Sequence, residues 1–190
     1  MKRRVARAVL WVFRWRLEGR RPDLDRYVLI AAPHTSNWDF VWMMTMALAL
    51  DMKIAWLGKH TLFDGPAGIL LRKLGGIPVV RDSGGEYVRR LAERFAAVKQ
   101  LALVVPPEGT RGKTDCWRSG FYRIAAAAGV PVVLSYLDFG QRRGGIGPSV
   151  ELTGNLRADM DTIRSFYDGM TGKYPQRSGP IRLKGEMDDG

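Results

Sequence analysis

Residues 27–50 read YVLIAAPHTSNWDFVWMMTMALAL, and this stretch decides the fold class. Tyr27–Ala32 is a short apolar run that is typical of a buried strand, and Pro33 ends it. Residues 35–37, Thr-Ser-Asn, are types that cap helices, and the apolar run Trp38–Leu50 then predicts a buried helix. A buried strand followed at once by a buried helix is the repeating unit of an α/β protein.

The rest of the chain continues this alternation. The predicted strands are Lys53–Leu57, Ile77–Val80, Leu101–Val105, Val130–Leu137 and Val150–Thr153, and the predicted helices are Pro66–Leu74, Glu86–Gln100, Arg118–Ala128 and Asp159–Met170. The glycine- and arginine-rich segment Gln141–Gly147 predicts a turn. We therefore expect one α/β domain over residues 22–172, with a mixed or largely parallel sheet flanked by helices. A polar, frayed C-terminal tail is expected over residues 173–190.

Positive charge is concentrated at the start of the chain. The 190 residues hold 30 Lys and Arg against 19 Asp and Glu, a formal net charge of +11. Residues 1–21 contain eight basic residues and one acid, Glu18, so they carry +7 and the other 169 residues only +4. A nucleic-acid-binding domain more often carries its basic residues through the folded body. The distribution therefore predicts that nucleic acid is not the partner.

Residues 1–21 are also predicted to form an amphipathic helix. At about 100° per residue, Arg3, Arg7 and Arg14 fall on one face, and Val5 and Val9 lie opposite. Two tryptophans lie near the boundary, which suits the border between water and lipid. We expect this helix to bind an anionic membrane surface. A first helix docked on the body, with solvated arginines, is the alternative.

Several other classes of protein are excluded by the residue types. Arg14 and Arg16 interrupt the apolar run that a signal peptide needs, and no apolar stretch reaches the roughly 18 residues of a membrane span. The single cysteine, Cys116, excludes an internal disulfide framework and indicates a reducing compartment. We therefore expect a cytoplasmic protein that is peripheral on the membrane surface. With only His34 and His60, a three-histidine zinc centre is excluded, and no metal or cofactor is expected.

Two loops that follow predicted strands carry residues suited to chemistry. In the first, His34 lies in the loop and Asp39 in the first helical turn, so the carboxylate can reach the imidazole and support its protonated form. A capping or core role is the alternative for such a pair. The second loop offers a carboxylate, a flexible backbone, a hydroxyl and a guanidinium, a set that can hold a polyol phosphate. Its members are Glu108, Gly109, Thr110 and Arg111.

The order and spacing of four motifs resemble those of the glycerophospholipid acyltransferases, the lysophosphatidic acid acyltransferase or PlsC-like group. The motifs are His-x4-Asp at 34–39, Gly-x-Ile-Pro-Val-x-Arg at 75–81, Pro-Glu-Gly-Thr-Arg at 107–111 and Val-Pro-Val-Val at 130–133. The resemblance implies transfer of a fatty acyl group from acyl-CoA or acyl carrier protein to a lysophospholipid hydroxyl. Other lipid acceptors, such as an aminolipid or a glycolipid, and a catalytically silent lipid-binding relative are the alternatives.

The resemblance also implies roles for individual residues. His34 would be the general base and Asp39 its orienting carboxylate. Glu108, Gly109, Thr110 and Arg111 would form the acceptor site, and Arg81 would help to bind the acceptor's phosphate. Backbone N–H groups around Gly109 are the candidate donors to the oxyanion of the reaction.

Overall fold

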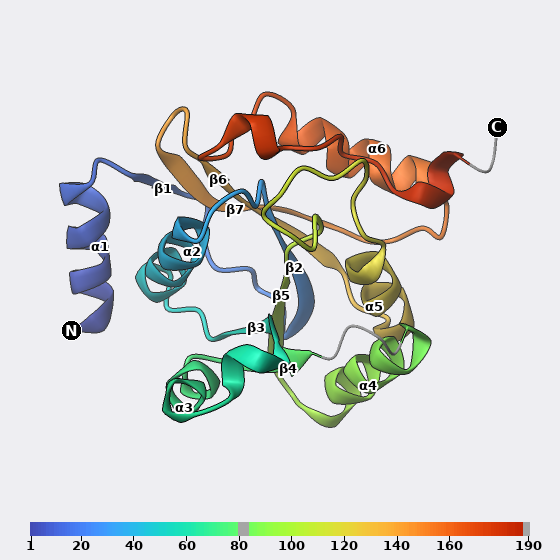
Figure 1. Ribbon diagram of the computed structural model, residues 1–190, viewed down its shortest axis with the longest axis horizontal. Helices are drawn as coiled ribbons and strands as arrows, with labels where there is room; N and C mark the ends of the chain where they lie inside the picture. Colours follow the sequence, from blue (N-terminus) through green and yellow to red (C-terminus); the bar gives the residue numbers. More distant parts are fainter. Residues whose placement is uncertain (80–83, 188–190) are drawn as a thin grey trace.

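A seven-stranded sheet forms the middle layer of the computed structural model, which describes residues 1–79 and 84–187 (Figure 1). Its strands are β1 (Arg16–Glu18), β2 (Arg26–Ala32), β3 (Ile54–Lys59), β4 (Gly76–Val79), β5 (Leu101–Val105), β6 (Val132–Asp138) and β7 (Arg143–Val150). They lie in the order β1-β7-β6-β2-β5-β3-β4, and every neighbouring pair is parallel except β6 and β7. The predicted α/β fold with a largely parallel sheet is confirmed.

Helices cover both faces of this sheet. The α-helices are α1 (Lys2–Val12), α2 (Trp38–Ala49), α3 (Pro66–Lys73), α4 (Gly84–Ala97), α5 (Gly120–Ala128) and α6 (Leu156–Tyr167), and the short 3₁₀ helices are η1 (His60–Phe63), η2 (Pro175–Arg177) and η3 (Lys184–Met187). In Figure 1, α1, α2 and α3 lie on the left of the sheet, and α4 and α5 on its right. Helix α6 shares one buried cluster with α4 and α5, which places it on their face.

The central strand β2 shows why both faces must be covered. Its neighbours β6 and β5 occupy both edges, and all residues of Tyr27–Ile30 are buried. Successive side chains of a strand point to opposite faces. Val28 and Ile30 therefore join the cluster under α4, α5 and α6, whereas Tyr27 and Leu29 join the cluster under α2. A continuous apolar run is what a strand covered on both faces requires.

The basic N-terminal segment is not one helix. Helix α1 ends at Val12, Arg14 has a positive φ of 58°, and residues 16–18 form the edge strand β1 beside β7. Trp15 is buried, with its ring 4.8 Å from that of Trp42 and 5.0 Å from that of Phe139. The prediction of a helix over residues 1–21 is therefore wrong beyond Val12, because burying this indole turns the chain back onto the body.

The C-terminal segment is not a frayed tail where the structure describes it. Leu183 is buried and forms an isolated bridge with Trp117, next to α5. The N–H of Tyr174 donates to the hydroxyl oxygen of Thr35 over 3.2 Å, and Arg177 donates to the carbonyl oxygen of Thr35 over 3.3 Å. Residues 173–187 thus pack on the domain, and part of this segment lies beside the loop that carries His34.

A strand also occupies most of the segment predicted as a glycine-rich turn. Strand β7 covers Arg143–Val150, so the predicted edge strand Val150–Thr153 is displaced toward the N-terminus. The glycines permit close packing here: a Cβ on Gly145 would lie 1.9 Å from the carbonyl oxygen of Glu18, and one on Gly147 would lie 2.3 Å from the Phe166 ring. Among the helices that the structure describes, none is both long and apolar enough to span a bilayer.

Candidate active site

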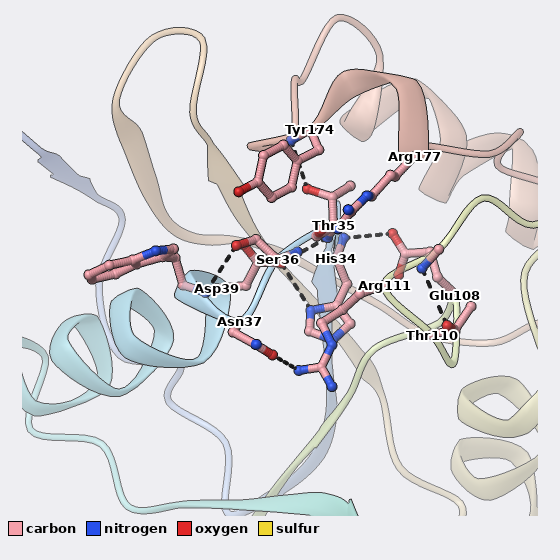
Figure 2. Close-up of polar contacts among 12 residues, drawn as sticks. His34, Thr35, Ser36, Asn37, Asp39, Glu108, Thr110, Arg111, Tyr174 and Arg177 are labelled. Carbon is pink, nitrogen blue, oxygen red and sulfur yellow. Dashed lines mark hydrogen bonds and ion pairs between the residues drawn. The ribbon is translucent and has the colours of Figure 1, made fainter.

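Two loops meet where the neighbouring strands β2 and β5 end. The strands are parallel, with Ile30 beside Val105, so the segments that follow them leave the sheet at the same edge. The loop after β2 carries His34 and leads into α2, and the loop after β5 carries Glu108 and Arg111 (Figure 2). Open α/β sheets place ligand sites at the carboxyl ends of their strands. The fold thus brings together two motifs that are more than seventy residues apart.

The side chains of His34 and Asp39 are in contact at this edge. His34 Nδ1 lies 3.1 Å from Asp39 Oδ2, and a dashed line marks this contact in Figure 2. The same carboxylate oxygen accepts hydrogen bonds from the N–H groups of Thr35 and Ser36, over 2.8 and 2.9 Å. These two bonds fix the carboxylate in the first turn of α2. Because Nδ1 faces this carboxylate, a neutral His34 with its proton on Nδ1 has the other ring nitrogen, Nε2, as its basic atom.

Glu108 holds the other side of the His34 loop. Its Oε1 accepts a hydrogen bond from the backbone N–H of His34 over 2.9 Å, and the residue is only 5% exposed. Burial raises the pKa of Glu108, an effect that the bond from His34 N–H opposes. Glu108 does not line the cavity that His34 lines, but lines a second cavity of about 570 Å³ on the α6 side. The resemblance implies that Glu108 contacts the acceptor. In this geometry Glu108 does not face the cavity of His34, so it would not touch an acceptor bound there.

The next three residues of the motif face the cavity of His34. Gly109 has φ +67°, and its N–H donates to the carbonyl oxygen of Pro106 over 3.1 Å. Because that donor is engaged in the turn, it is not free to bind an oxyanion, so of the N–H groups around Gly109 this one is excluded as a donor. Thr110 and Arg111 also line the cavity, and an Arg111 guanidinium N–H donates to Asn37 Oδ1. Arg81, the second predicted cation, lies outside the described residues.

A cavity of about 880 Å³ extends from His34 between α2 and the sheet. Most of its lining is apolar and comes from α2, β3 and the η1–α3 region. These residues are Phe40, Met43, Met46, Ala47, Leu50, Met52, Ile54, Trp56, Leu57, Leu62 and Leu71. Three basic side chains also line it: Lys59, Arg111 and Arg177. The space is suited to a long apolar chain whose reactive end lies at His34 and whose anionic group lies near a cation.

Sequence reasoning missed two residues of this site. Arg177 belongs to η2, lines the cavity of His34, and stacks its guanidinium 4.6 Å from the centre of the Tyr174 ring. Asn37, which precedes α2, receives the Arg111 hydrogen bond and so links the two motif loops. Neither residue stands in a spacing pattern that marks it in the sequence. Asn37 is near His34 because it lies in the same loop, whereas the proximity of Arg177 follows from the packing of residues 174–177 against Thr35.

A metal centre is not evident at this site. Among the residues that the structure describes, no group of three or more His, Cys, Asp or Glu side chains is arranged to hold a metal ion. The arrangement instead offers a supported imidazole, a guanidinium and an apolar cavity, which together suit proton transfer during attack by a hydroxyl.

Comparison with known proteins assigns the chain to a family. The family model described as Acyltransferase matches residues 14–135, which is more than half of the chain and includes both motif loops. The structure is similar to the crystal structure of the 1-acyl-sn-glycerophosphate (LPA) acyltransferase PlsC from Thermotoga maritima, with a TM-score of 0.57 and 19% identity. The match covers 85% of this chain and 74% of that one, and at this identity it shows a shared fold. No curated protein matches the chain significantly.

Proposed function

Because the chain belongs to the acyltransferase family, we propose that it transfers a fatty acyl group from an acyl thioester to the hydroxyl of a lysophospholipid such as 1-acylglycerol 3-phosphate. The observation that carries the proposal is the His34–Asp39 pair at one end of a large apolar cavity that Arg111 also lines. The acceptor class is supported by the shared fold with the PlsC enzyme, whose name specifies a 1-acyl-sn-glycerophosphate.

His34 is the general base of the proposed reaction. Its Nε2 removes the proton of the acceptor hydroxyl while the oxygen attacks the thioester carbonyl carbon. The new C–O bond forms, the C–S bond breaks, and the proton passes from the imidazolium to the departing thiolate. General-base help of this kind is worth about 10²–10⁴ in rate. Because a thiol has a pKa of about 8.5, the thiolate leaves without a strong acid.

Two charged side chains support this step. Asp39 stabilises the imidazolium through the 3.1 Å contact with Nδ1. Arg111 lines the same cavity and keeps further N–H groups besides the one directed at Asn37, because a guanidinium carries five. We propose that Arg111 binds either the negatively charged phosphate of the acceptor or the carbonyl oxygen as it becomes negative. Arg177 is a second cation for the same anionic group.

The apolar part of the cavity holds the acyl chain in this proposal. The lining runs along α2 from Phe40 near its first turn to Leu50 just beyond its last residue. A helix rises about 1.5 Å per residue, so these residues span roughly 15 Å. Met43, Met46 and Ala47 lie between them on the cavity wall. Bulk at this wall would set the chain length that the enzyme accepts.

We propose that the protein is cytoplasmic and acts while it is bound peripherally to a membrane surface. The end of helix α1 exposes Trp11 and Val12, and Phe13 just after it is exposed too, beside the basic residues of the N-terminal segment; Trp11 is 80% exposed. Apolar burial at the headgroup boundary together with attraction to anionic lipid is what binds such a helix. The lysophospholipid acceptor would then be supplied by the bilayer.

The test follows thiol release and lipid product together. Wild type and His34→Ala are incubated with a medium-chain acyl-CoA and lysophosphatidic acid, with His60→Ala as the matched control for loss of a histidine. We expect phosphatidic acid and free thiol from wild type and His60→Ala, and a loss of about 10²–10⁴-fold in His34→Ala. Equal product from His34→Ala and wild type would overturn the role of His34. Thiol release without phosphatidic acid would reject this acceptor, and the same assay with acyl carrier protein identifies the donor.

A further inference from the structure

The η1–α3 region presents an apolar outer face that nothing in the chain covers within the described residues. Ile69 and Leu70 on α3 are 61% and 60% exposed, and Leu62 on η1 and Leu74 just after α3 are exposed as well. Large exposed apolar side chains that are close together in one segment are typical of an interaction site. In this text the four residues Leu62, Ile69, Leu70 and Leu74 are called the α3 face.

The inner side of the same region closes the cavity of His34. Leu71 follows Leu70 directly but lines the cavity, and Leu62 also contributes to that lining. Helix α3 packs closely on η1, because a Cβ on Gly68 would lie 2.0 Å from the carbonyl oxygen of Phe63. The segment formed by η1 and α3 therefore lies between the apolar cavity on its inner side and an exposed apolar surface on its outer side.

Basic side chains border the α3 face. Lys59, Arg72 and Lys73 are all exposed, and Asp64 is the one acid between residues 59 and 74. The guanidinium of Arg72 lies 5.2 Å from the centre of the Phe63 ring, which keeps it beside the apolar residues. Apolar residues bordered by cations complement a bilayer that contains anionic lipid.

The position of α3 fits a joint contact with α1. Figure 1 shows both helices on the same side of the sheet, with α2 between them. We propose that the α3 face is a second membrane-binding element, which inserts Leu62, Ile69, Leu70 and Leu74 into an anionic bilayer and sets the wall of the acyl-chain cavity against the lipid. The role of that cavity rests on the proposed function, but the membrane contact itself is measurable without activity.

The first experiment measures binding of the full chain to vesicles by sedimentation. The vesicles contain phosphatidylcholine mixed with phosphatidylglycerol, and the variant Ile69→Glu/Leu70→Glu is compared with wild type. Ala96→Glu/Val98→Glu is the matched control, because it adds the same charge at exposed positions near the end of α4, on the opposite face of the sheet. We expect affinity for the vesicles to fall by at least about tenfold in the α3 variant and by a much smaller factor in the control.

A second measurement locates the contact without adding charge. Cys116 is the only cysteine, so Cys116→Ser/Leu70→Cys carries one polarity-sensitive dye at the α3 face, and Cys116→Ser/Val98→Cys carries it on α4. We expect a blue shift on adding the vesicles only for the label at position 70. Thermal unfolding of each variant shows that it is folded.

The outcomes separate this proposal from the proposed function. Equal loss of binding in both double-Glu variants, or a label at position 70 that does not shift while the protein is vesicle-bound, overturns the α3 contact. A wild-type dimer that Ile69→Glu/Leu70→Glu dissociates without a change in vesicle binding overturns it too, in favour of a second copy of the chain. Failure of acyl transfer by vesicle-bound wild type would count against the proposed function and leave the membrane contact standing.

Discussion

Replacing Asp39 with asparagine separates the two roles of this side chain. One oxygen, Oδ2, faces His34 Nδ1 and also accepts the backbone hydrogen bonds of Thr35 and Ser36. The carbonyl oxygen of asparagine still accepts hydrogen bonds from the same donors, so the loop is expected to keep its conformation. What asparagine removes is the negative charge beside the imidazole. Asp39→Asn therefore tests the support of the imidazolium, largely apart from the fold of the loop.

The magnitude follows from the change in that one contact. A hydrogen bond to a charged group contributes about 1.5–3 kcal/mol, against about 0.5–1.5 kcal/mol for a neutral pair. Losing the charge should therefore raise the barrier by about 1–2 kcal/mol, which lowers kcat by roughly 5- to 30-fold. Asp39→Ala, in contrast, leaves two buried N–H groups unpaired at about 1–3 kcal/mol each. It should destabilise the protein by roughly 2–6 kcal/mol, whereas Asp39→Asn should not.

The assay is a double-mutant cycle on kcat, measured by thiol release with lysophosphatidic acid as acceptor. If Asp39 acts through His34, then Asp39→Asn should lower kcat in wild type but have no further effect in His34→Ala. A further loss of the same factor in the His34→Ala background would refute the reasoning, because Asp39 would then act on the substrate directly. An unchanged kcat in the single variant Asp39→Asn would refute it as well.

Four further predictions concern other parts of the molecule. Burial raises the pKa of Glu108, so its contribution to stability is present at low pH and lost as pH rises through that raised pKa; Glu108→Gln should unfold at a higher urea concentration than wild type at neutral pH and lose this advantage in acid. Gly145→Ala places a Cβ 1.9 Å from the Glu18 carbonyl oxygen, and should lower the free energy of unfolding by about 1–3 kcal/mol in urea titrations, or by more if β1 detaches. Ala47→Met narrows the cavity and should lower kcat/KM for long-chain acyl-CoA by at least about tenfold, with little change for the shortest chain accepted. Binding of the protein to anionic vesicles should weaken as salt rises, and salt-independent sedimentation would contradict the electrostatic part of the membrane contact.

The parts of the fold that sequence predicted best are those where local pattern and tertiary burial agree. Tyr27–Ala32 is apolar at every position, and the structure covers both faces of that strand. The capping residue types before Trp38 predicted the start of α2 correctly, although Asn37 makes no capping hydrogen bond and the Ser36 hydroxyl accepts the N–H of Trp38 instead. This start brings Asp39 within reach of His34. Neighbouring parallel strands end at the same edge of a sheet. Because β2 and β5 are such neighbours, the two motif loops that follow them lie close together.

The parts that sequence missed depend on contacts between distant segments. The segment Gln141–Gly147 is rich in glycine, and glycine weakens strands in general. Here Gly145 lets the backbone of β1 approach, and Gly147 accommodates the Phe166 ring, so the same residues that predict a turn are what β7 requires. The sequence around Trp15 does not indicate that its ring packs on Trp42 and Phe139. No local pattern describes the shape of a surface provided by other elements.

Glu108 shows the same limit within the candidate site. A carboxylate, a hydroxyl and a guanidinium in one short loop predict a set of ligand contacts, because residue type alone says what each group can bind. The structure divides them: Arg111 and Thr110 line the cavity of His34, and Glu108 turns to the α6 side and accepts the N–H of His34. Asp39 fixes the imidazole, and Glu108 fixes the backbone that carries it. The carboxylates of both motifs thus converge on one histidine, which is the arrangement expected if its position limits the rate of proton transfer.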